Sequence, residues 1–245
     1  MRSLILAIQF LTRLPTPQLG NFEQRELTHC APWFPWVGML VGLLVTAFAL
    51  LGGTLDSWLG ALLALLMWVW VTGALHLDGL SDLVDGLGAA HRDPARLLQV
   101  MRDPHVGNFG VIALIVQTLS KLVLLRVALN HATLTLATLP LICAWARFGA
   151  IAWSACLPTL SGSSTESFTW QIDKTLLMVN ALLLAALTFY FAPTLLIAPL
   201  CLAAWAWFLH RKVGGMSGDC LGAGIEVTES ALLLWSVLPV VKWYP

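Results

Sequence analysis

Long apolar segments with almost no charge are the feature that most restricts what this chain can fold into. A helix that crosses the hydrocarbon core of a bilayer needs about 20 predominantly apolar residues. Seven segments fit, the last three being shorter or interrupted: 33–51, 57–75, 109–129, 133–157, 175–191, 194–209 and one ending near Val241. The runs are continuously apolar and do not alternate, which predicts helices and not membrane barrel strands.

Composition agrees with a membrane protein. Hydrophobic residues make up 58% of the chain and charged residues 11%, whereas a soluble domain has about 25% charged residues. The net charge is zero, so no basic surface suggests a nucleic-acid partner. We therefore predict an all-α, polytopic membrane bundle of about seven transmembrane helices. The opening MRSLILAIQFLTRLPTP predicts a short amphipathic or re-entrant helix, because Arg13 and two prolines follow where a signal peptide would be cleaved.

The distribution of lysine and arginine predicts the orientation of the bundle. Cytoplasmic loops are enriched in these residues, and the links 52–56, 130–132 and 192–193 contain none. The other links carry most of them: Arg2, Arg13, Arg25, Arg92, Arg96, Arg102, Lys174, Arg211 and Lys212. We expect one membrane-embedded catalytic domain over residues 1–245, with its active-site loops, 76–108 and 210–229, at the cytoplasmic face.

The stretch HLDGLSDLVDG, residues 76–86, gathers three carboxylates directly after an apolar segment. Asp78, Asp82 and Asp85 are spaced i, i+4 and i+7, so a helix places them on one stripe. Three like charges repel one another, whereas Mg²⁺ would take carboxylate oxygens together with waters and substrate phosphates. The alternative is a solvated helix end, which would be the better interpretation if the acids stood alone.

The following loop favours the metal and phosphate site. It contains MRDPHVGNFG, residues 101–110. Arg102 could clamp a phosphate with two hydrogen bonds, and Gly107 could open a helix N-terminus that binds an anion. Asp103 is a fourth candidate metal ligand or a general base.

A second polar segment, KVGGMSGDCLGAGIEVTE, covers residues 212–229 and again combines glycines with spaced acids. Asp219 and Glu226 are seven residues apart, on one helix stripe, and an acid at the depth of Glu226 is costly unless it is paired or functional. Lys121 either snorkels or pairs. Arg147 should face the bundle interior, paired with an acid or a phosphate. His76 has either a substrate-binding or a structural role.

The motifs HLDGLSDLVDG, MRDPHVGNFG and SGDCLGAGIE, in this order, resemble the cobalamin synthase family, adenosylcobinamide-GDP ribazoletransferase. FLTRLPTP and PWFPWVGMLVG near the N-terminus are similar to that family as well, so the resemblance covers nearly the whole chain. A second family, the CDP-alcohol phosphotransferases, has a motif that begins DxxDGxxAR. Residues 82–90, DLVDGLGAA, match its opening but have alanine in place of the arginine, and no GxxxDxxxD follows.

The first resemblance implies a transfer at the bacterial inner membrane that depends on Mg²⁺. A hydroxyl of α-ribazole, or of its 5′-phosphate, would attack the cobinamide-side phosphorus of adenosylcobinamide-GDP and expel GMP. The implied metal ligands are Asp78, Asp82, Asp85 and Asp103, of which Asp82, Asp85 and Asp103 are also the candidate catalytic residues. The implied substrate-binding residues are His76, Arg102, His105, Gly107, Arg147, Lys212, Asp219 and Glu226. Membrane lipid surrounds such a protein, which could work alone, as a homo-oligomer or with other cobalamin-assembly enzymes.

A third hypothesis is a transporter or ion channel that uses the intramembrane charges Lys121, Arg147 and Glu226 for translocation. The sequence shows no inverted repeat with interrupted helices that would support it. Most of the charge is predicted at the cytoplasmic face, which favours an enzyme.

Overall fold

The computed structural model describes residues 2–17, 19, 29–90, 93–131, 137–160 and 172–238. These parts of the chain fold into helices with no β-strand among them, and only an isolated bridge joins Thr159 to Met216. The elements are α1 (Arg2–Leu11), η1 (Ala31–Trp33), α3 (Phe34–Gly53), α4 (Ser57–Thr72), α5 (Leu75–Ala89), α6 (Pro94–Met101), α7 (Asn108–Asn130), α8 (Thr138–Cys156), α9 (Lys174–Phe191), η3 (Pro193–Ile197), α10 (Ala198–Lys212) and α11 (Gly218–Val237).

The prediction of a polytopic helical membrane protein is confirmed. Within the described residues, six helices are long and apolar enough to cross a bilayer, and the bent pair formed by α4 and α5 could make a seventh span. Most of α8 and α11 is buried, whereas only 17% of α7, 17% of α9 and 22% of the span that contains α10 are buried, and all three expose large apolar side chains. Such exposed apolar faces suit contact with lipid. The end of the last predicted segment, near Val241, lies outside the described residues.

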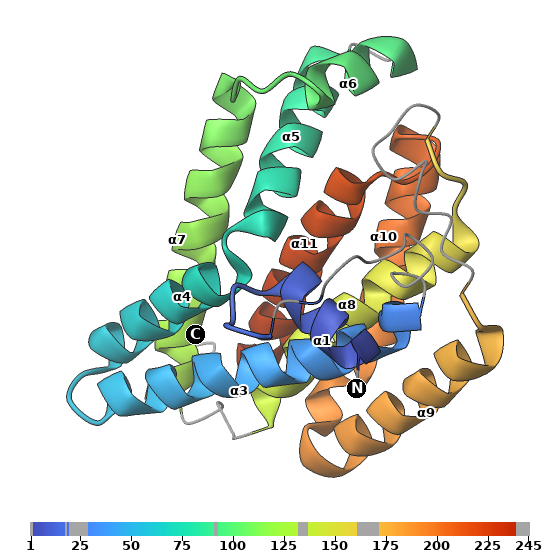
Figure 1. Cartoon of the computed structure of the whole chain (residues 1–245). Coiled ribbons are helices and arrows are strands. Elements are labelled where there is room, and N and C mark those ends of the chain that lie inside the picture. Colours follow the sequence, from blue (N-terminus) through green and yellow to red (C-terminus); the bar gives the residue numbers. More distant parts are fainter. Residues whose placement is uncertain are drawn as a thin grey trace.

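Helices α3, α4 and α8 pack closely because small residues line their interfaces. A side chain at Gly42 would collide with the backbone of Leu139 and Pro140 on α8, and one at Gly38 with the carbonyl of Cys143. Two glycines four residues apart let helix backbones approach each other, as is common in membrane proteins. Figure 1 shows α3 and α4 as an antiparallel pair, with α5 and α7 rising side by side from its end.

The structure corrects one predicted span. The helix expected over residues 57–75 ends at Thr72, and the chain then turns by 85° into α5, so HLDGLSDLVDG forms a helix of its own. Gly73 ends α4 with φ +61°, and Ala74 follows at φ +60°. Two successive residues in the left-handed region cannot continue a right-handed helix. Periodicity missed this turn because both of its flanks are helical.

Candidate active site

Helices α5 and α11 cross at two glycines, and this crossing brings acids from both helices together. A Cβ at Gly79 would lie 2.8 Å from the carbonyl oxygen of Asp219, and one at Gly222 would lie 3.4 Å from the Cα of His76. Asp219 therefore lies against the turn of α5 that carries Asp78. Gly79 is required here because the backbone of Asp219 lies so close, whereas a Cβ at Gly222 would make only an ordinary van der Waals contact.

Asp78, Asp82 and Asp219 form what we call the acidic patch. Asp78 is exposed, whereas Asp82 and Asp219 are half-buried. The negative charges of Asp78 and Asp219 both act on Asp82, and the charge of Asp78 acts on Asp219. The patch therefore concentrates negative charge from two helices that are 130 residues apart in the chain, as SGDCLGAGIE and HLDGLSDLVDG predict.

The sequence spacing grouped Asp85 with Asp78 and Asp82, but the carboxylate of Asp85 is hydrogen-bonded to the backbone at the start of α7. It is buried, and its two carboxylate oxygens accept hydrogen bonds from the backbone N–H groups of Gly107, at 2.7 Å, and Gly110, at 2.9 Å. Gly107 precedes α7, so the anion at this helix N-terminus is a side chain of the protein itself. The backbone N–H of Gly107, predicted to bind substrate, is occupied by Asp85.

The remaining predicted residues of the loops are exposed. The Asp103 carboxylate accepts a hydrogen bond from the backbone N–H of His105 at 3.0 Å and contacts the Nδ1 atom of the same residue at 2.7 Å. These two hydrogen bonds lower the pKa of Asp103 below its usual value. Arg102 directly follows α6, and Lys212 lies in the last turn of α10.

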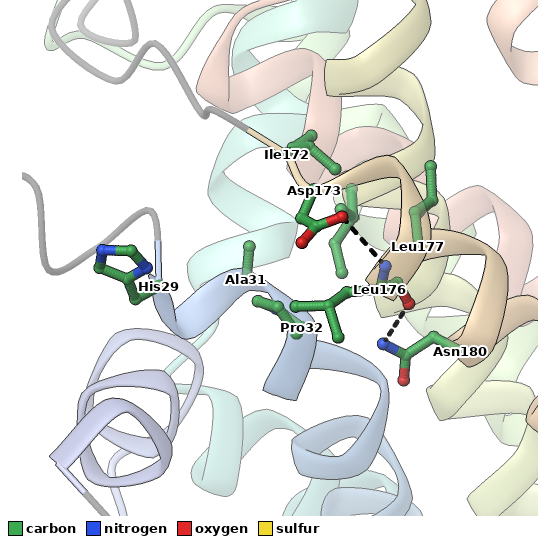
Figure 2. A pocket seen from close by; sticks show the side chains of 9 residues that line it. His29, Ala31, Pro32, Ile172, Asp173, Leu176, Leu177 and Asn180 are labelled. Atoms are coloured by element: carbon green, nitrogen blue, oxygen red, sulfur yellow. Dashed lines mark hydrogen bonds between the residues drawn. The ribbon is translucent and has the colours of Figure 1, made fainter.

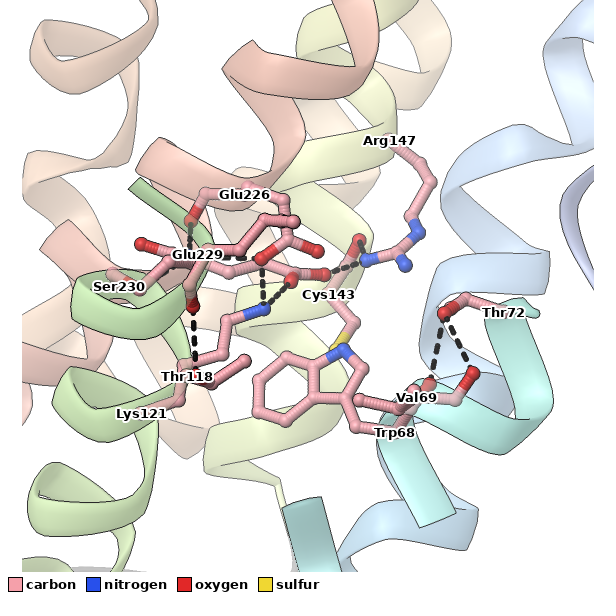
Figure 3. Close-up of polar contacts among 12 residues, drawn as sticks. Trp68, Val69, Thr72, Thr118, Lys121, Cys143, Arg147, Glu226, Glu229 and Ser230 are labelled. Atoms are coloured by element: carbon pink, nitrogen blue, oxygen red, sulfur yellow. Dashed lines mark hydrogen bonds and ion pairs between the residues drawn. The ribbon is translucent and has the colours of Figure 1, made fainter. Parts of the chain in front are cut away.

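Charged residues from three helices form a second, fully buried group, the charge cluster of Lys121, Arg147, Glu226 and Glu229 (Figure 3). The Nζ atom of Lys121 lies 2.7 Å from Glu226 and 2.6 Å from Glu229, and Arg147 pairs with Glu229. Lys121 also stands 4.2 Å from the ring centroid of Trp68. Two cations meet two anions, so the cluster is neutral overall.

The charge cluster shows which partners the intramembrane charges Lys121, Arg147 and Glu226 contact. The sequence predicts that Arg147 faces the interior and pairs with an acid or a phosphate. It faces the interior and pairs with an acid, Glu229, which had no predicted role, so its guanidinium is already engaged at the place where a substrate was expected. The signal for Glu229 was available, because an acid at this depth requires a partner. Glu226, expected at the active site with Asp219, contacts Lys121 and Gln117 instead, seven residues or about 10 Å farther along α11. His76 is buried near the same charges.

A cavity of about 670 Å³ opens beside the acidic patch, at the turn between α4 and α5, and we call it the bend cavity. Asp78 lines it, together with Gln9, Thr12 and Arg13 from the segment around the end of α1. Sequence reasoning assigned no role to Arg13. The only available signal was the motif FLTRLPTP, which contains it.

A smaller cavity of about 180 Å³ lies between the segment that leads into η1 and the start of α9 (Figure 2). His29 and Pro32 line it on one side and Asp173 and Asn180 on the other, and Asp173 already accepts hydrogen bonds from the backbone at the start of α9. None of the predicted site residues lines this cavity.

The chain matches known proteins over nearly its whole length. The sequence model of the family described as cobalamin-5-phosphate synthase matches residues 3–237. The chain is 56% identical over 238 residues to an adenosylcobinamide-GDP ribazoletransferase of Laribacter hongkongensis, covering 97% of each protein. It is 49% identical over 238 residues to a protein of the same name from Thiobacillus denitrificans, covering 96% of this chain and 94% of the other. No solved structure matches the chain.

Proposed function

The chain belongs to the cobalamin-5-phosphate synthase family and is a transferase, and from that premise we propose that it joins adenosylcobinamide-GDP to α-ribazole or its 5′-phosphate. The bond between the cobinamide-side phosphorus and the bridging oxygen breaks, and its electron pair stays with GMP. The hydroxyl oxygen of α-ribazole forms the new bond to phosphorus, and the hydroxyl proton is released. The products are adenosylcobalamin, or its 5′-phosphate, and GMP.

The observation that carries this proposal is the acidic patch beside the bend cavity. Phosphoryl transfer depends mainly on positioning and on neutralisation of the phosphate charges. A diphosphate cannot approach three carboxylates without a cation between them, since all of these groups are negative. An acidic patch next to a cavity therefore supports a phosphorylated substrate that binds together with a metal ion.

We propose Mg²⁺ as that ion, because the donor set of the patch fits its chemistry. Mg²⁺ usually keeps several waters and binds one or two carboxylates together with substrate phosphates. Within the described ranges, no three His, Cys, Asp or Glu side chains lie close enough together to hold a metal by themselves. We propose Asp78 and Asp82 as the protein ligands, with Asp219 beside them and the diphosphate completing the site. The ion would neutralise the charge on the transferring phosphoryl group.

We propose different roles for Asp85 and Asp103, the other two predicted metal ligands. Asp85 positions the start of α7 through its two backbone hydrogen bonds and so orders the adjoining loop. Asp103 has a lowered pKa, which makes it a weaker proton acceptor. We therefore propose Asp82, and not Asp103, as the carboxylate that receives the hydroxyl proton, either directly or through a water.

We place the patch and its loops at the cytoplasmic side of the bacterial inner membrane. Arg96 on α6, Arg102 directly after it, and Arg211 and Lys212 in the last turn of α10 are exposed basic residues, in keeping with cytoplasmic loops.

The test is GMP release by the purified protein in lipid vesicles that contain adenosylcobinamide-GDP. Release should require both α-ribazole and Mg²⁺, and Asp82→Asn should abolish it. Asp56→Asn is the matched control. Asp56 caps the N-terminus of α4, the end of that helix away from the bend, and asparagine caps a helix almost as well as aspartate does. Release of CMP from a CDP-alcohol, or GMP release that EDTA leaves unchanged, would contradict the proposal.

A further inference from the structure

The segment that follows α1 is attached to the turn between α4 and α5. The backbone N–H of Arg13 donates a hydrogen bond to the carbonyl of Val71 at 2.7 Å, in the last turn of α4. The side chain of Arg13 then lies so close to Gly73 that a Cβ there would collide with its Nε atom. The backbone of Arg13 is thus held at the bend, and its exposed side chain lies beside Gly73, although 60 residues separate the two positions.

The bend itself is conformationally strained. Ala74 adopts φ +60°, a region in which residues with a side chain pay a free-energy cost. Such strained residues gather at active sites and ligand clamps when the surrounding structure maintains them. Here the strain turns α5 away from α4 and leaves the bend cavity between Arg13 and Asp78.

The cavity has the size and charge for one end of a nucleotide diphosphate. Its volume of about 670 Å³ lies within the range of small-molecule sites, roughly 300–1,000 Å³. Arg13 is the one cation among its described lining residues, and Asp78, a proposed Mg²⁺ ligand, is their one anion. A guanidinium can donate two parallel hydrogen bonds to a phosphate. A diphosphate with one phosphate near Arg13 and its metal at Asp78 satisfies both groups.

We propose that Arg13 binds the guanylyl phosphate of adenosylcobinamide-GDP, the phosphate that leaves as part of GMP. This inference rests on the proposed function. When the bridging P–O bond breaks, negative charge accumulates on the phosphate of the departing GMP. A guanidinium at this position stabilises that charge as it develops, which lowers the barrier. In this proposal the nucleotide lies in the bend cavity, which is on the side of the acidic patch that faces α1 and the bend.

The direct test measures GMP binding, not turnover alone. The dissociation constant of GMP is determined by titration calorimetry on the purified, detergent-solubilised protein with Mg²⁺ present. Loss of a charge-assisted hydrogen-bonded pair should weaken binding about 10- to 100-fold in Arg13→Gln. Arg13→Lys should recover part of the loss, because it keeps the charge but not the planar fork. Arg96→Gln, an exposed arginine on α6, should bind GMP like the wild type.

A second variant guards against misfolding of Arg13→Gln. Leu75 lines the cavity from the start of α5 and takes no part in the hydrogen bond between Arg13 and Val71, so the larger side chain of Leu75→Trp should occupy cavity volume and also weaken GMP binding. The KM for α-ribazole should stay unchanged in both variants.

The inference is overturned if GMP binds both variants as tightly as the wild type, or if the variants raise the KM for α-ribazole 5′-phosphate and leave GMP binding alone. The proposed function fails separately, when the wild-type protein itself releases no GMP from adenosylcobinamide-GDP.

Discussion

The charge cluster predicts strong thermodynamic coupling between Lys121 and Glu226. Replacing Lys121 by methionine keeps the length of the side chain but removes the cation that both glutamates contact, at 2.7 Å and 2.6 Å. Arg147 can then compensate only Glu229. The cluster acquires a net negative charge in a region where both acids are at most 5% exposed.

The expected magnitude follows from the burial of these groups. Removing one partner of a buried ion pair costs about 3–5 kcal/mol, because the other partner stays buried and charged. The same range applies to Glu226→Gln, which leaves an excess of positive charge. The double variant, Lys121→Met with Glu226→Gln, is neutral again and keeps the pair of Arg147 and Glu229. We expect it to lose only hydrogen bonds, about 1–3 kcal/mol, much less than the sum of the single variants.

The assay is reversible unfolding of the purified protein in mixed micelles that are titrated with a denaturing detergent and followed by far-ultraviolet circular dichroism. The free energy of unfolding is compared among the wild type, the two single variants and the double variant. Lys174→Met is the control, since Lys174 is exposed at the start of α9 and its loss should change stability by less than about 0.5 kcal/mol. Additivity of the two single variants within about 0.5 kcal/mol would refute the argument, because independent sites behave in that way.

Three further predictions concern the helices around the acidic patch. Asp85→Ala leaves two N–H groups of α7 without their acceptor and should cost about 1–3 kcal/mol, visible as faster hydrogen exchange at the start of that helix; unchanged exchange would contradict this role. Gly79→Ala would place a Cβ 2.8 Å from the Asp219 carbonyl and should sharply reduce GMP release, whereas Gly53→Ala, which meets only the end of a leucine side chain at 3.3 Å, should not. Ala74→Gly relieves a left-handed alanine and should stabilise the protein by about 1 kcal/mol; a loss of stability in the unfolding assay would show that Ala74 is not strained.

Much of the fold can be predicted from local sequence pattern. The prediction is wrong where the local pattern carries no information. Six of the seven predicted segments correspond to helices whose described ends differ from the expectation by a few residues, since apolar length is a property of continuous sequence. The segment 57–75 failed because two residues, Gly73 and Ala74, reverse the direction of the chain. Alanine is a strong helix former, so its left-handed conformation is imposed by the packing around it.

The candidate site, too, follows in part from local sequence pattern and in part from how the helices pack. Asp78 and Asp82 lie on one helix, α5, as their spacing predicts, and Asp219 reaches them from α11. Spacing also predicted Asp85 on that stripe, but the approach of α7 offers it two backbone N–H groups. A carboxylate is stabilised by such hydrogen bonds, so the neighbouring helix decided its role.

The sequence by itself determined that this chain is a helical membrane protein and, through its ordered motifs, to which family it belongs. Apolar length and the identity of reactive residues are local properties, and they can be read along the chain. Only the tertiary structure decided that Glu229 neutralises Arg147, that Asp85 holds α7, and that Arg13 and Asp78 line one cavity at the bend. The physical reason is that a buried charge is stabilised by whichever opposite charge or hydrogen-bond partner lies within a few ångströms, and helix packing selects those partners from residues tens of positions apart.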